Sequence, residues 1–406
     1  MTTLDRITPI RELPIEDKRV FIRCDFNVPL EEQDGKQVIT DDARITEALP
    51  TIKHAIERGA RVILASHLGR PKKGPDPKLS LEPVGTRLAE LLGVEVHMPE
   101  DCIGDAAKKV VYDLRKGQVC LLENLRFHAE EEKDDETFAA KLGELADVYV
   151  CDAFGAVHRA HASVHALPKS MRERGCGFLL EKEIAALGKV ITAPEKPFVA
   201  ILGGAKVSDK IAVLDNLIEK VDALIIGGAM ANTFLAAKGA NLQKSKIEED
   251  KLALARTILE KAGEKKVEVA LPVDVVVAQS LEASEGRVVD VGSIPENHMA
   301  LDIGPKSAAN FEKLISKAKT VLWNGPMGLF EKTPFASGTF AIAKAMAASN
   351  AFTVIGGGDS AAAVKEAGDD VAKKIKHIST GGGASLELIE GKKLPGIEVL
   401  RRNTVG

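Results

Sequence analysis

Short runs of β-branched and aliphatic residues alternate with segments of helical periodicity along almost the whole chain. In the first half, the runs that predict strands are Arg19–Arg23, Arg61–Ser66, Val94–His97, Val119–Leu122 and Val148–Asp152. In the second half they are Phe198–Leu202, Ala223–Ile226, Val267–Leu271, Val273–Ala278, Thr320–Trp323 and Thr353–Ile355. Between these runs, apolar residues recur at helical spacing, as at Leu88, Leu91 and Leu92. This alternation predicts βαβ units and an α/β fold with two doubly wound, Rossmann-like parallel sheets.

The boundary between the two predicted sheets falls near residues 180–196. Glu181–Ile191 has helical periodicity, and Thr192–Pro197 is a cluster of helix breakers before the next strand. A chain of 406 residues is also longer than one ordinary domain. We therefore expect a first domain of residues 1–180 joined by the tail 395–406, a connecting helix and hinge over 181–196, and a second domain over 197–394.

Composition supports buried parallel sheets and argues against nucleic acid as a partner. Hydrophobic residues make up 45% of the chain but aromatic residues only 4%, so the cores must be built from Val, Ile, Leu and Ala. The formal net charge is −4, whereas proteins that bind a phosphate backbone carry a basic surplus.

Cysteine usage and the absence of long apolar stretches indicate the compartment. The five cysteines are odd in number and include no C-x-x-C pair, which is typical of reduced thiols in the cytosol. Met1–Pro14 has no apolar leader, and the longest apolar stretch, Ala223–Ala237, is too short to span a membrane. We expect a soluble cytoplasmic protein, and the scarcity of apolar surface stretches favours a monomer.

Arginine and glycine are divided between the two halves of the chain. Fourteen of eighteen arginines lie within residues 1–180, while the second half carries glycine clusters at 203–204, 227–228, 356–358 and 381–383. Arginine offers a rigid fork of donors to a carboxylate or phosphate, whereas glycine allows backbone N–H groups to approach a phosphate closely. This division predicts two anion sites of different chemistry.

In the first half, charged residues follow the ends of several predicted strands. Open α/β sheets bind ligands beyond the carboxyl ends of their strands. The runs at these ends are Asp25–Pro29, His67–Pro71, Glu123–Phe127 and His158–His161, and the last three each contain an arginine. A single surface arginine is usually solvated, but several at equivalent ends of one sheet favour an anion site over solvated loops.

The histidines of this half also permit a metal-site interpretation. His158, His161 and His165 are close in sequence, but no carboxylate or cysteine completes a zinc set at suitable spacing. Arg159 between them would repel a cation. Hydrogen bonding to a phosphate or carboxylate, or simple loop filling, remain the two interpretations of these histidines.

In the second half, glycines and lysines follow strands. Phe198–Leu202 runs into Gly203–Lys210, in which Lys206 and Lys210 are predicted to share one face at a helix start. Gly356–Ser360 follows another strand and opens an alanine-rich helix, and Asp359 there suits Mg²⁺. One glycine pair alone would indicate a tight turn, but several at strand–helix junctions favour nucleotide binding.

Other function classes are disfavoured by missing motifs. The chain has no G-x-x-x-x-G-K-[ST], so it is not a P-loop enzyme, and no G-x-G-x-x-G, which weakens a dehydrogenase interpretation. A non-catalytic, two-domain anion-binding protein would typically be exported, and it would not need Lys206, Lys210 and Asp359 on a second domain.

The chain resembles the phosphoglycerate kinase family. The resemblance rests on segments ordered along nearly the whole chain: Arg23–Pro29, His67–Pro71, Glu123–Phe127, Asp152–Ser163, Gly203–Lys210, Trp323–Gly328, Gly356–Ser360 and Ser379–Glu387. Two positions depart from the family pattern. Ala156-Val157 replaces the usual Thr-Ala before His-Arg, which implies a lost hydroxyl contact, and Cys24 stands where Val or Ala is usual.

The resemblance implies substrate-binding roles in the first half. Asp25 and Asn27 would hold the hydroxyl and carboxylate region of the glycerate. A basic patch would grip 3-phosphoglycerate, with Leu68 and Gly69 beside it: Arg23, His67, Arg70, Arg126 and Arg159. Arg44 would face the transferring phosphoryl group as a catalytic residue.

The resemblance implies nucleotide-binding roles in the second half. Lys206 and Lys210, the other two expected catalytic residues, would contact the nucleotide phosphates and the transferring group. Gly203 would also lie at the nucleotide, Glu331 would bind the ribose, and Gly304 would lie near the adenine. The phosphates would be cradled by Gly357, Gly358, Asp359 and Ser360, with Mg²⁺ on Asp359 as the cofactor of ATP or ADP.

The implied reaction passes an acyl phosphate from 1,3-bisphosphoglycerate to ADP, giving 3-phosphoglycerate and ATP, in glycolysis. In reverse the nucleophile is a carboxylate, which is already ionised at neutral pH because carboxyl groups titrate near ~4. No general base is required, so catalysis is expected from alignment and charge neutralisation. Two sites on separate domains also imply hinge closure around 181–196.

Overall fold

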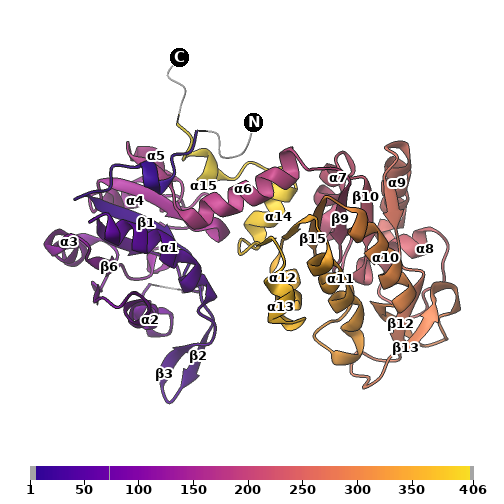
Figure 1. Cartoon of the computed structure of the whole chain (residues 1–406). Helices are drawn as coiled ribbons and strands as arrows, with labels where there is room; N and C mark the ends of the chain where they lie inside the picture. The colour runs from indigo at the N-terminus through magenta and orange to yellow at the C-terminus, as the bar shows by residue number, and fades with distance from the viewer. Residues whose placement is uncertain (1–5, 73, 403–406) are drawn as a thin grey trace. The chain divides into compact units, whose positions relative to one another are not determined.

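The protein, described here from a computed structural model over residues 6–72 and 74–402, forms two compact units (Figure 1). The first unit takes in the described residues up to Ala185 and those from Lys393 onward, and the second is Ala186–Lys392. The division falls inside the helix α6 (Phe178–Thr192). No helix of the described residues has the length and apolar character needed to cross a membrane.

The first unit is built on a parallel sheet of six strands in the order β5-β6-β4-β1-β7-β8. Its strands are β1 (Arg19–Cys24), β4 (Arg61–Ala65), β5 (Val96–His97), β6 (Val119–Leu121), β7 (Val148–Asp152) and β8 (Arg174–Cys176). An antiparallel hairpin of β2 (Leu30–Gln33) and β3 (Lys36–Ile39) projects from this unit (Figure 1).

Helices cover the sheet because its strands are apolar on both faces. Val20 and Ile22 pack in one core with α1 and α2, while Phe21 on the opposite face stacks on Tyr149 with ring centroids 5.9 Å apart. The helices are α1 (Ala43–Glu57), α2 (Glu82–Leu92), α3 (Gly104–Asp113), α4 (Glu136–Gly143), α5 (Ala166–Ser170), the start of α6, and α15 (Pro395–Glu398).

The second unit has its own parallel sheet of six strands in the order β11-β10-β9-β15-β16-β17. Its strands are β9 (Phe198–Leu202), β10 (Ala223–Ile226), β11 (Glu268–Ala270), β15 (Thr320–Asn324), β16 (Phe352–Ile355) and β17 (His377–Ile378). The two predicted parallel sheets are thus confirmed.

One predicted strand of the second unit joins a different sheet. The run Val273–Ala278 forms β12 (Asp274–Ala278), which pairs antiparallel with β13 (Arg287–Asp290) and β14 (Met299–Ile303). The prediction of parallel sheets alone is therefore wrong here, because the chain returns through β13 and β14 without a crossover helix.

Helices of the second unit connect and cover these strands. They are the end of α6, α7 (Ile211–Ile218), α8 (Gly228–Ala237), α9 (Leu252–Glu264), α10 (Pro305–Lys317), α11 (Ser337–Ala348), α12 (Gly358–Glu366), α13 (Asp369–Ala372) and α14 (Gly383–Ile389). Val199, Ile201 and Trp323 pack in a core with α10 and α11, so a face of this sheet is buried under helices.

Candidate functional site

The predicted site residues of the first unit gather at the carboxyl ends of three adjacent strands. β1 lies between β4 and β7, with Arg23 in register with Ala65 and Cys151. The chain leaves these strands at Asp25, at Ser66 and at Ala153. Because the strands are parallel, the loops that follow them meet at one edge of the sheet.

Asp25 and Asn27 join three segments at this edge. An Asp25 oxygen lies 2.6 Å from Arg44 Nη1, at the start of α1. Asn27 Oδ1 accepts a hydrogen bond from Gly69 N at 2.8 Å, and Asn27 N donates to Asp25 Oδ1 at 3.2 Å. The predicted groups Asp25, Asn27, Arg44 and Gly69 are thus brought together.

Arg126 enters the same group through its contact with the loop after β4. Its Nη1 donates to Gly69 O at 2.7 Å, and the Asn124 amide donates to Leu68 O at 2.8 Å and accepts from Leu68 N at 3.1 Å. Asn124 was not among the predicted residues, although it holds the Leu68–Gly69 backbone in place. Its position just beyond a buried strand was the signal that could have found it.

Arg70 and Arg159 differ from the other arginines because both are exposed. Arg159 Nε contacts His158 Nε2 at 3.1 Å, whereas no described residue forms a hydrogen bond or ion pair with Arg70. Both guanidinium groups are open to solvent, where a carboxylate or phosphate could be bound.

Positive charge is concentrated at this edge. Burial lowers the pKa of His67 to about 3, and nearby Arg23, Arg126 and Arg44 contribute to this shift. Burial together with Arg126 and Arg23 lowers the pKa of His161 to about 4. Burial alone would raise the pKa of Asp25, but the neighbouring His67, Arg44 and Arg23 lower it overall. An anion would find a strongly positive environment here.

Arg23, which was expected in the basic patch, is buried. Its side chain is only 1% exposed, and its guanidinium contacts Ser163 Oγ at 2.7 Å, His67 Nδ1 at 3.2 Å and the carbonyl of Cys24. Each of the three guanidinium nitrogens thus has a partner within the protein, whereas Arg70 and Arg159 are exposed.

In the second unit, Asn324 connects the predicted nucleotide residues. Asn324 Oδ1 accepts from Lys210 Nζ, and its Nδ2 donates to Gly356 O at 2.9 Å. The carbonyl of Asn324 accepts from Gly203 N at 3.0 Å. Asn324 ends β15, which lies between β9 and β16. It was not predicted as a site residue, although it belongs to the Trp323–Gly328 segment that carries part of the family resemblance.

The segment 356–360 has the predicted strand-to-helix geometry. Gly357 has φ +93°, a conformation that favours glycine, and a Cβ there would lie 3.1 Å from the Asn324 amide. Ser360 Oγ accepts from Gly325 N at 2.6 Å, and the α12 amino end follows with Asp359 exposed. Such a helix start suits phosphate oxygens.

Lys206 and Lys210 do not share a helical face, so that prediction is wrong. Lys206 lies in the exposed loop after β9, and Lys210 ends a 3₁₀ turn (Ser208–Lys210) before α7. The backbone amide and the hydroxyl of Ser208 both donate to the Glu248 carboxylate, which attaches this turn to a segment 40 residues further along the chain. Burial lowers the pKa of Lys210, while Asp209 and Asp359 oppose this shift.

Gly304 and Glu331 are not connected to the Lys210 group by any hydrogen bond or ion pair among the described residues. A Cβ on Gly304 would lie 2.3 Å from the Asp274 carboxyl carbon, so packing alone accounts for this glycine. Glu331 is exposed and lines a cavity of about 660 Å³ with residues 282–286 and 332–334.

Asp359 is compatible with Mg²⁺ bound together with nucleotide phosphates. Mg²⁺ is commonly held by one or two carboxylates while phosphates and water complete its shell. The exposed Asp359 carboxylate beside the α12 amino end fits that arrangement.

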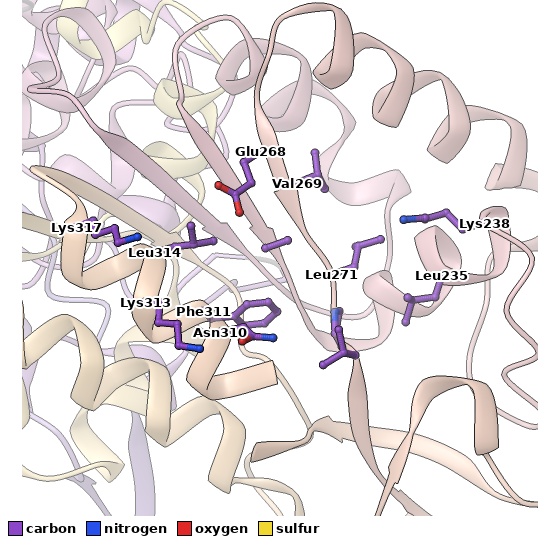
Figure 2. A pocket seen from close by; sticks show the side chains of 13 residues that line it. Leu235, Lys238, Glu268, Val269, Leu271, Asn310, Phe311, Lys313, Leu314 and Lys317 are labelled. Carbon is purple, nitrogen blue, oxygen red and sulfur yellow. The ribbon is translucent and has the colours of Figure 1, made fainter. Parts of the chain in front are cut away.

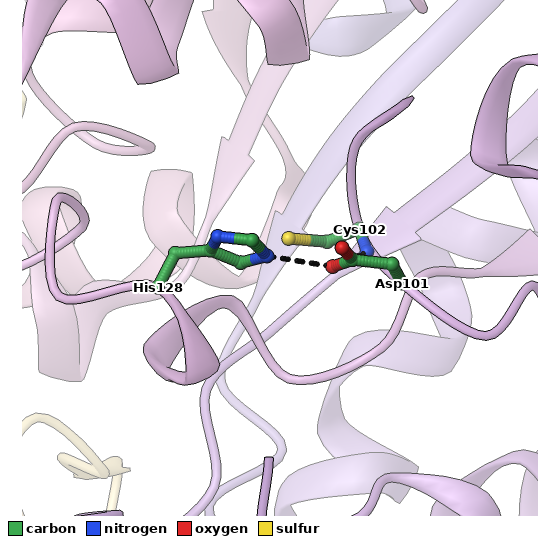
Figure 3. Close-up of side chains that lie close together, drawn as sticks. All are labelled: Asp101, Cys102 and His128. Atoms are coloured by element: carbon green, nitrogen blue, oxygen red, sulfur yellow. Dashed lines mark hydrogen bonds and ion pairs between the residues drawn. The ribbon is translucent and has the colours of Figure 1, made fainter. Parts of the chain in front are cut away.

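A separate cluster of possible metal ligands lies in the first unit (Figure 3). Asp101 Oδ1 is 2.7 Å from His128 Nε2 and accepts from Cys102 N at 2.6 Å. Cys102 is fully buried, and burial raises the pKa of its thiol well above the ordinary value. These contacts explain the cluster as a tether between the loop after β5 and the Arg126 segment.

A second cavity of the second unit, of about 550 Å³, lies beside the edge strand β11 (Figure 2). Its lining includes Leu235, Leu271, Phe311 and three lysines: Lys238, Lys313 and Lys317. None of the predicted site residues lines it.

Comparisons with known proteins agree over nearly the whole chain. The family model described as phosphoglycerate kinase matches residues 10–392. The phosphoglycerate kinase of Anaeromyxobacter sp. (strain Fw109-5) is 60% identical over 394 residues, which cover 96% of this chain and 98% of that protein. That of Acidobacterium capsulatum is 56% identical over 400 residues, with the same coverage of 96% and 98%.

Solved structures of this family have the same fold. Phosphoglycerate kinase from Coxiella burnetii is 41% identical and superposes with a TM-score of 0.89, covering 97% of this chain and 98% of that one. The enzyme from Pyrococcus horikoshii OT3 is 34% identical with a TM-score of 0.79, again covering 97% and 98%. The chain therefore belongs to the phosphoglycerate kinase family, and it is a phosphotransferase with a carboxyl group as acceptor.

Proposed function

We propose that this protein catalyses the glycolytic transfer of a phosphoryl group between 1,3-bisphosphoglycerate and ADP, giving 3-phosphoglycerate and ATP. The observation that carries the proposal is that each unit holds one group of residues suited to binding an anion. One presents arginines around Asp25 and Asn27, and the other presents Lys210 with the glycine-rich start of α12. The family membership supports the same reaction.

In the first unit, the acid phosphate would be held by Asp25, Asn27 and the backbone of Leu68–Gly69. The exposed Arg70 and Arg159, together with Arg126 and His67, would bind its anionic groups. Arg44 would face the transferring phosphoryl group. Its side chain is 37% accessible, and its ion pair with Asp25 holds it at the edge of the sheet that carries Asp25 and Asn27.

In the second unit, Lys210, Lys206, Gly203 and the segment 357–360 would hold the nucleotide phosphates. Glu331 would bind the ribose, and Gly304 would lie near the adenine. Asp359 would hold Mg²⁺, which would neutralise phosphate charge when the nucleotide is bound. Burial lowers the pKa of Lys210, and a bound phosphate would favour its charged form.

The chain's own residues then need only to align the reactants and neutralise charge. The carboxylate oxygen of 3-phosphoglycerate attacks the γ-phosphorus of ATP, a P–O bond to that carboxylate forms, and the bond to the ADP oxygen breaks. No proton has to be removed from the nucleophile. Arginine and lysine side chains can stabilise the negative charge of the transferring group.

We further propose that the residues 1–180 with 395–406 serve as the acid-phosphate domain, 197–394 as the nucleotide domain, and 181–196 as the hinge. Because the two sets of ligands are carried by different units, transfer requires closure. We also propose a cytoplasmic monomer without nucleic-acid or membrane partners, supported by the net charge of −4 and five free, buried cysteines.

A coupled assay tests the reaction. We expect ADP to form only when ATP, Mg²⁺ and 3-phosphoglycerate are all present. ADP formation without 3-phosphoglycerate, or none with all three, would contradict the proposal. Replacing 3-phosphoglycerate with inorganic phosphate or glycerate provides matched controls for a simple ATPase.

A further inference from the structure

A buried chain of polar side chains lies beneath the anion site of the first unit. Arg23 Nε contacts Ser163 Oγ at 2.7 Å, and Ser163 Oγ contacts Glu131 Oε1 at 2.5 Å. The second Glu131 oxygen accepts from Ser163 N at 2.9 Å. Arg23 is 1% exposed, and Ser163 and Glu131 are fully buried. These residues come from β1 and from two loops that the sequence separates widely.

The hydrogen bonds in this chain can run in one direction only. Burial raises the pKa of the Glu131 carboxyl, but the Arg23 charge and the two hydrogen bonds from Ser163 favour its ionised form. A guanidinium only donates, and an ionised carboxylate only accepts. The single hydroxyl proton of Ser163 therefore points to Glu131, and its lone pair receives the Arg23 Nε proton. A buried guanidinium and a buried carboxylate connected in this way compensate each other's charge.

The other end of Arg23 contacts His67. Arg23 Nη2 lies 3.2 Å from His67 Nδ1, and because the guanidinium can only donate, Nδ1 must be an acceptor. Burial and the charges of Arg23, Arg126 and Arg44 lower the pKa of His67 to about 3, although the Asp25 carboxylate opposes them. The imidazole is therefore neutral near pH 7, and its one proton resides on Nε2.

We propose that Glu131 and Ser163 are positioning residues which act through Arg23 to hold His67 as an Nε2–H donor for the anionic substrate of the first unit. This inference rests on the proposed function, which assigns 3-phosphoglycerate to that unit. No described residue is hydrogen-bonded to His67 Nε2, and His67 remains 8% exposed at the edge where the exposed arginines lie. The neutral Nε2–H donor would orient the substrate through a directional hydrogen bond, while the arginines supply positive charge.

The alternative is that the hydrogen bonds between Glu131, Ser163 and Arg23 have a purely structural role. In that case Ser163 and Glu131 would contribute to stability only, and their loss would leave the His67 tautomer and substrate affinity unchanged. A direct measurement of the His67 tautomer distinguishes the two possibilities.

The test compares Ser163→Ala with Tyr149→Phe in the full-length protein. Tyr149 is also fully buried, and its hydroxyl donates to the backbone carbonyl of Ser163 at 2.8 Å, so its removal disturbs the same place without breaking the chain to Arg23. Glu131→Gln, which keeps the side-chain shape, is the second variant in case Ser163→Ala does not fold.

Long-range ¹H–¹⁵N correlation spectra of histidine-labelled protein report the tautomer, with the His67 signals assigned from His67→Gln. We expect the Nε2–H form alone in the unsubstituted protein and in Tyr149→Phe, and a mixture of tautomers in Ser163→Ala or Glu131→Gln. The KM for 3-phosphoglycerate should rise about tenfold in the latter two, as for one lost hydrogen bond to a charged group, while the KM for ATP stays constant.

An Nδ1–H form in the unsubstituted protein would overturn the inference, as would an unchanged tautomer and unchanged KM in folded Ser163→Ala and Glu131→Gln. The tautomer is measured without turnover, so this result does not depend on the proposed reaction. An inactive unsubstituted protein would contradict the proposed function alone, whereas an active one with an unaffected Ser163→Ala would contradict the inference alone.

Discussion

At the scale of single residues, the arginines of the first unit divide into buried and accessible groups. Arg23 is enclosed, whereas Arg70 and Arg159 are exposed and Arg44 is partly so. Burial of a guanidinium has to be matched by partners, and Arg23 has them in Ser163, His67 and Cys24. The accessible arginines retain donors for a ligand, so they are the ones whose loss should affect turnover most directly.

Arg44→Ala is expected to lower kcat by about 10²–10³-fold with folding intact, because the substitution removes a positive charge that is proposed to face the transferring phosphoryl group. Steady-state kinetics and a thermal melt measure the two effects. Arg87→Ala is the matched control, since Arg87 is a comparably accessible arginine paired with Asp42 beside the start of α1. Near-normal turnover of Arg44→Ala would refute its role, and an equal loss in Arg87→Ala would indicate a general electrostatic effect.

His67 should make unfolding depend on pH. Its pKa is about 3 in the folded protein against an ordinary 6.5, so below pH 6.5 the unfolded chain binds a proton that the folded one does not. The free energy of unfolding should therefore decrease as pH falls from about 6.5 toward 3, by at most about 1.4 kcal/mol per pH unit from this group.

Urea unfolding measures this contribution when the free energies of unfolding of the unsubstituted protein and of His67→Gln are compared at several pH values. The unsubstituted protein should lose stability more steeply than the variant between pH 6 and 4, a range that lies between the two pKa values. Parallel pH profiles of the two proteins would show that His67 does not titrate as described.

At the scale of elements, the start of α12 depends on Gly357. Its φ of +93° and ψ of 145° lie in a region that is essentially confined to glycine and costs a residue with a Cβ about 1–3 kcal/mol. The added Cβ would also lie 3.1 Å from the Asn324 amide that binds Lys210 and Gly356. Gly368, which precedes α13, has φ +122° but open space where a Cβ would be.

Gly357→Ala and Gly368→Ala should therefore lose comparable stability, but only Gly357→Ala should raise the KM for ATP, by about tenfold or more. Thermal melts and kinetics with varied ATP distinguish backbone strain from disturbance of the site. Equal KM values for ATP in both variants would count against a phosphate site at the α12 amino end.

At the scale of the whole molecule, the proposed reaction requires the two units to approach each other. We expect small-angle X-ray scattering to give a smaller radius of gyration with both 3-phosphoglycerate and a non-hydrolysable ATP analogue than with either ligand alone. An unchanged radius with both ligands at saturating concentration would argue against closure. Bovine serum albumin measured with the same ligands controls for contrast changes.

The sequence by itself was sufficient for the two parallel sheets and for the residues at their carboxyl ends. An apolar run followed by a polar loop is a local pattern, and parallel strands then bring such loops to one edge. For that reason Asp25, Asn27, Gly69 and Arg126 were predicted together, and they contact one another.

Only the tertiary structure decided which groups are buried and how they are connected. Arg23 and Ser163 are 140 residues apart in the chain, and Lys210 and Asn324 are 114 apart, so no spacing or periodicity relates them. Glu131 lies within a run of three glutamates that looks like a solvated surface, yet it is fully buried. Local patterns specify strands, helices and their ends, whereas burial and hydrogen-bond partners depend on which distant segments the packed sheets bring into contact.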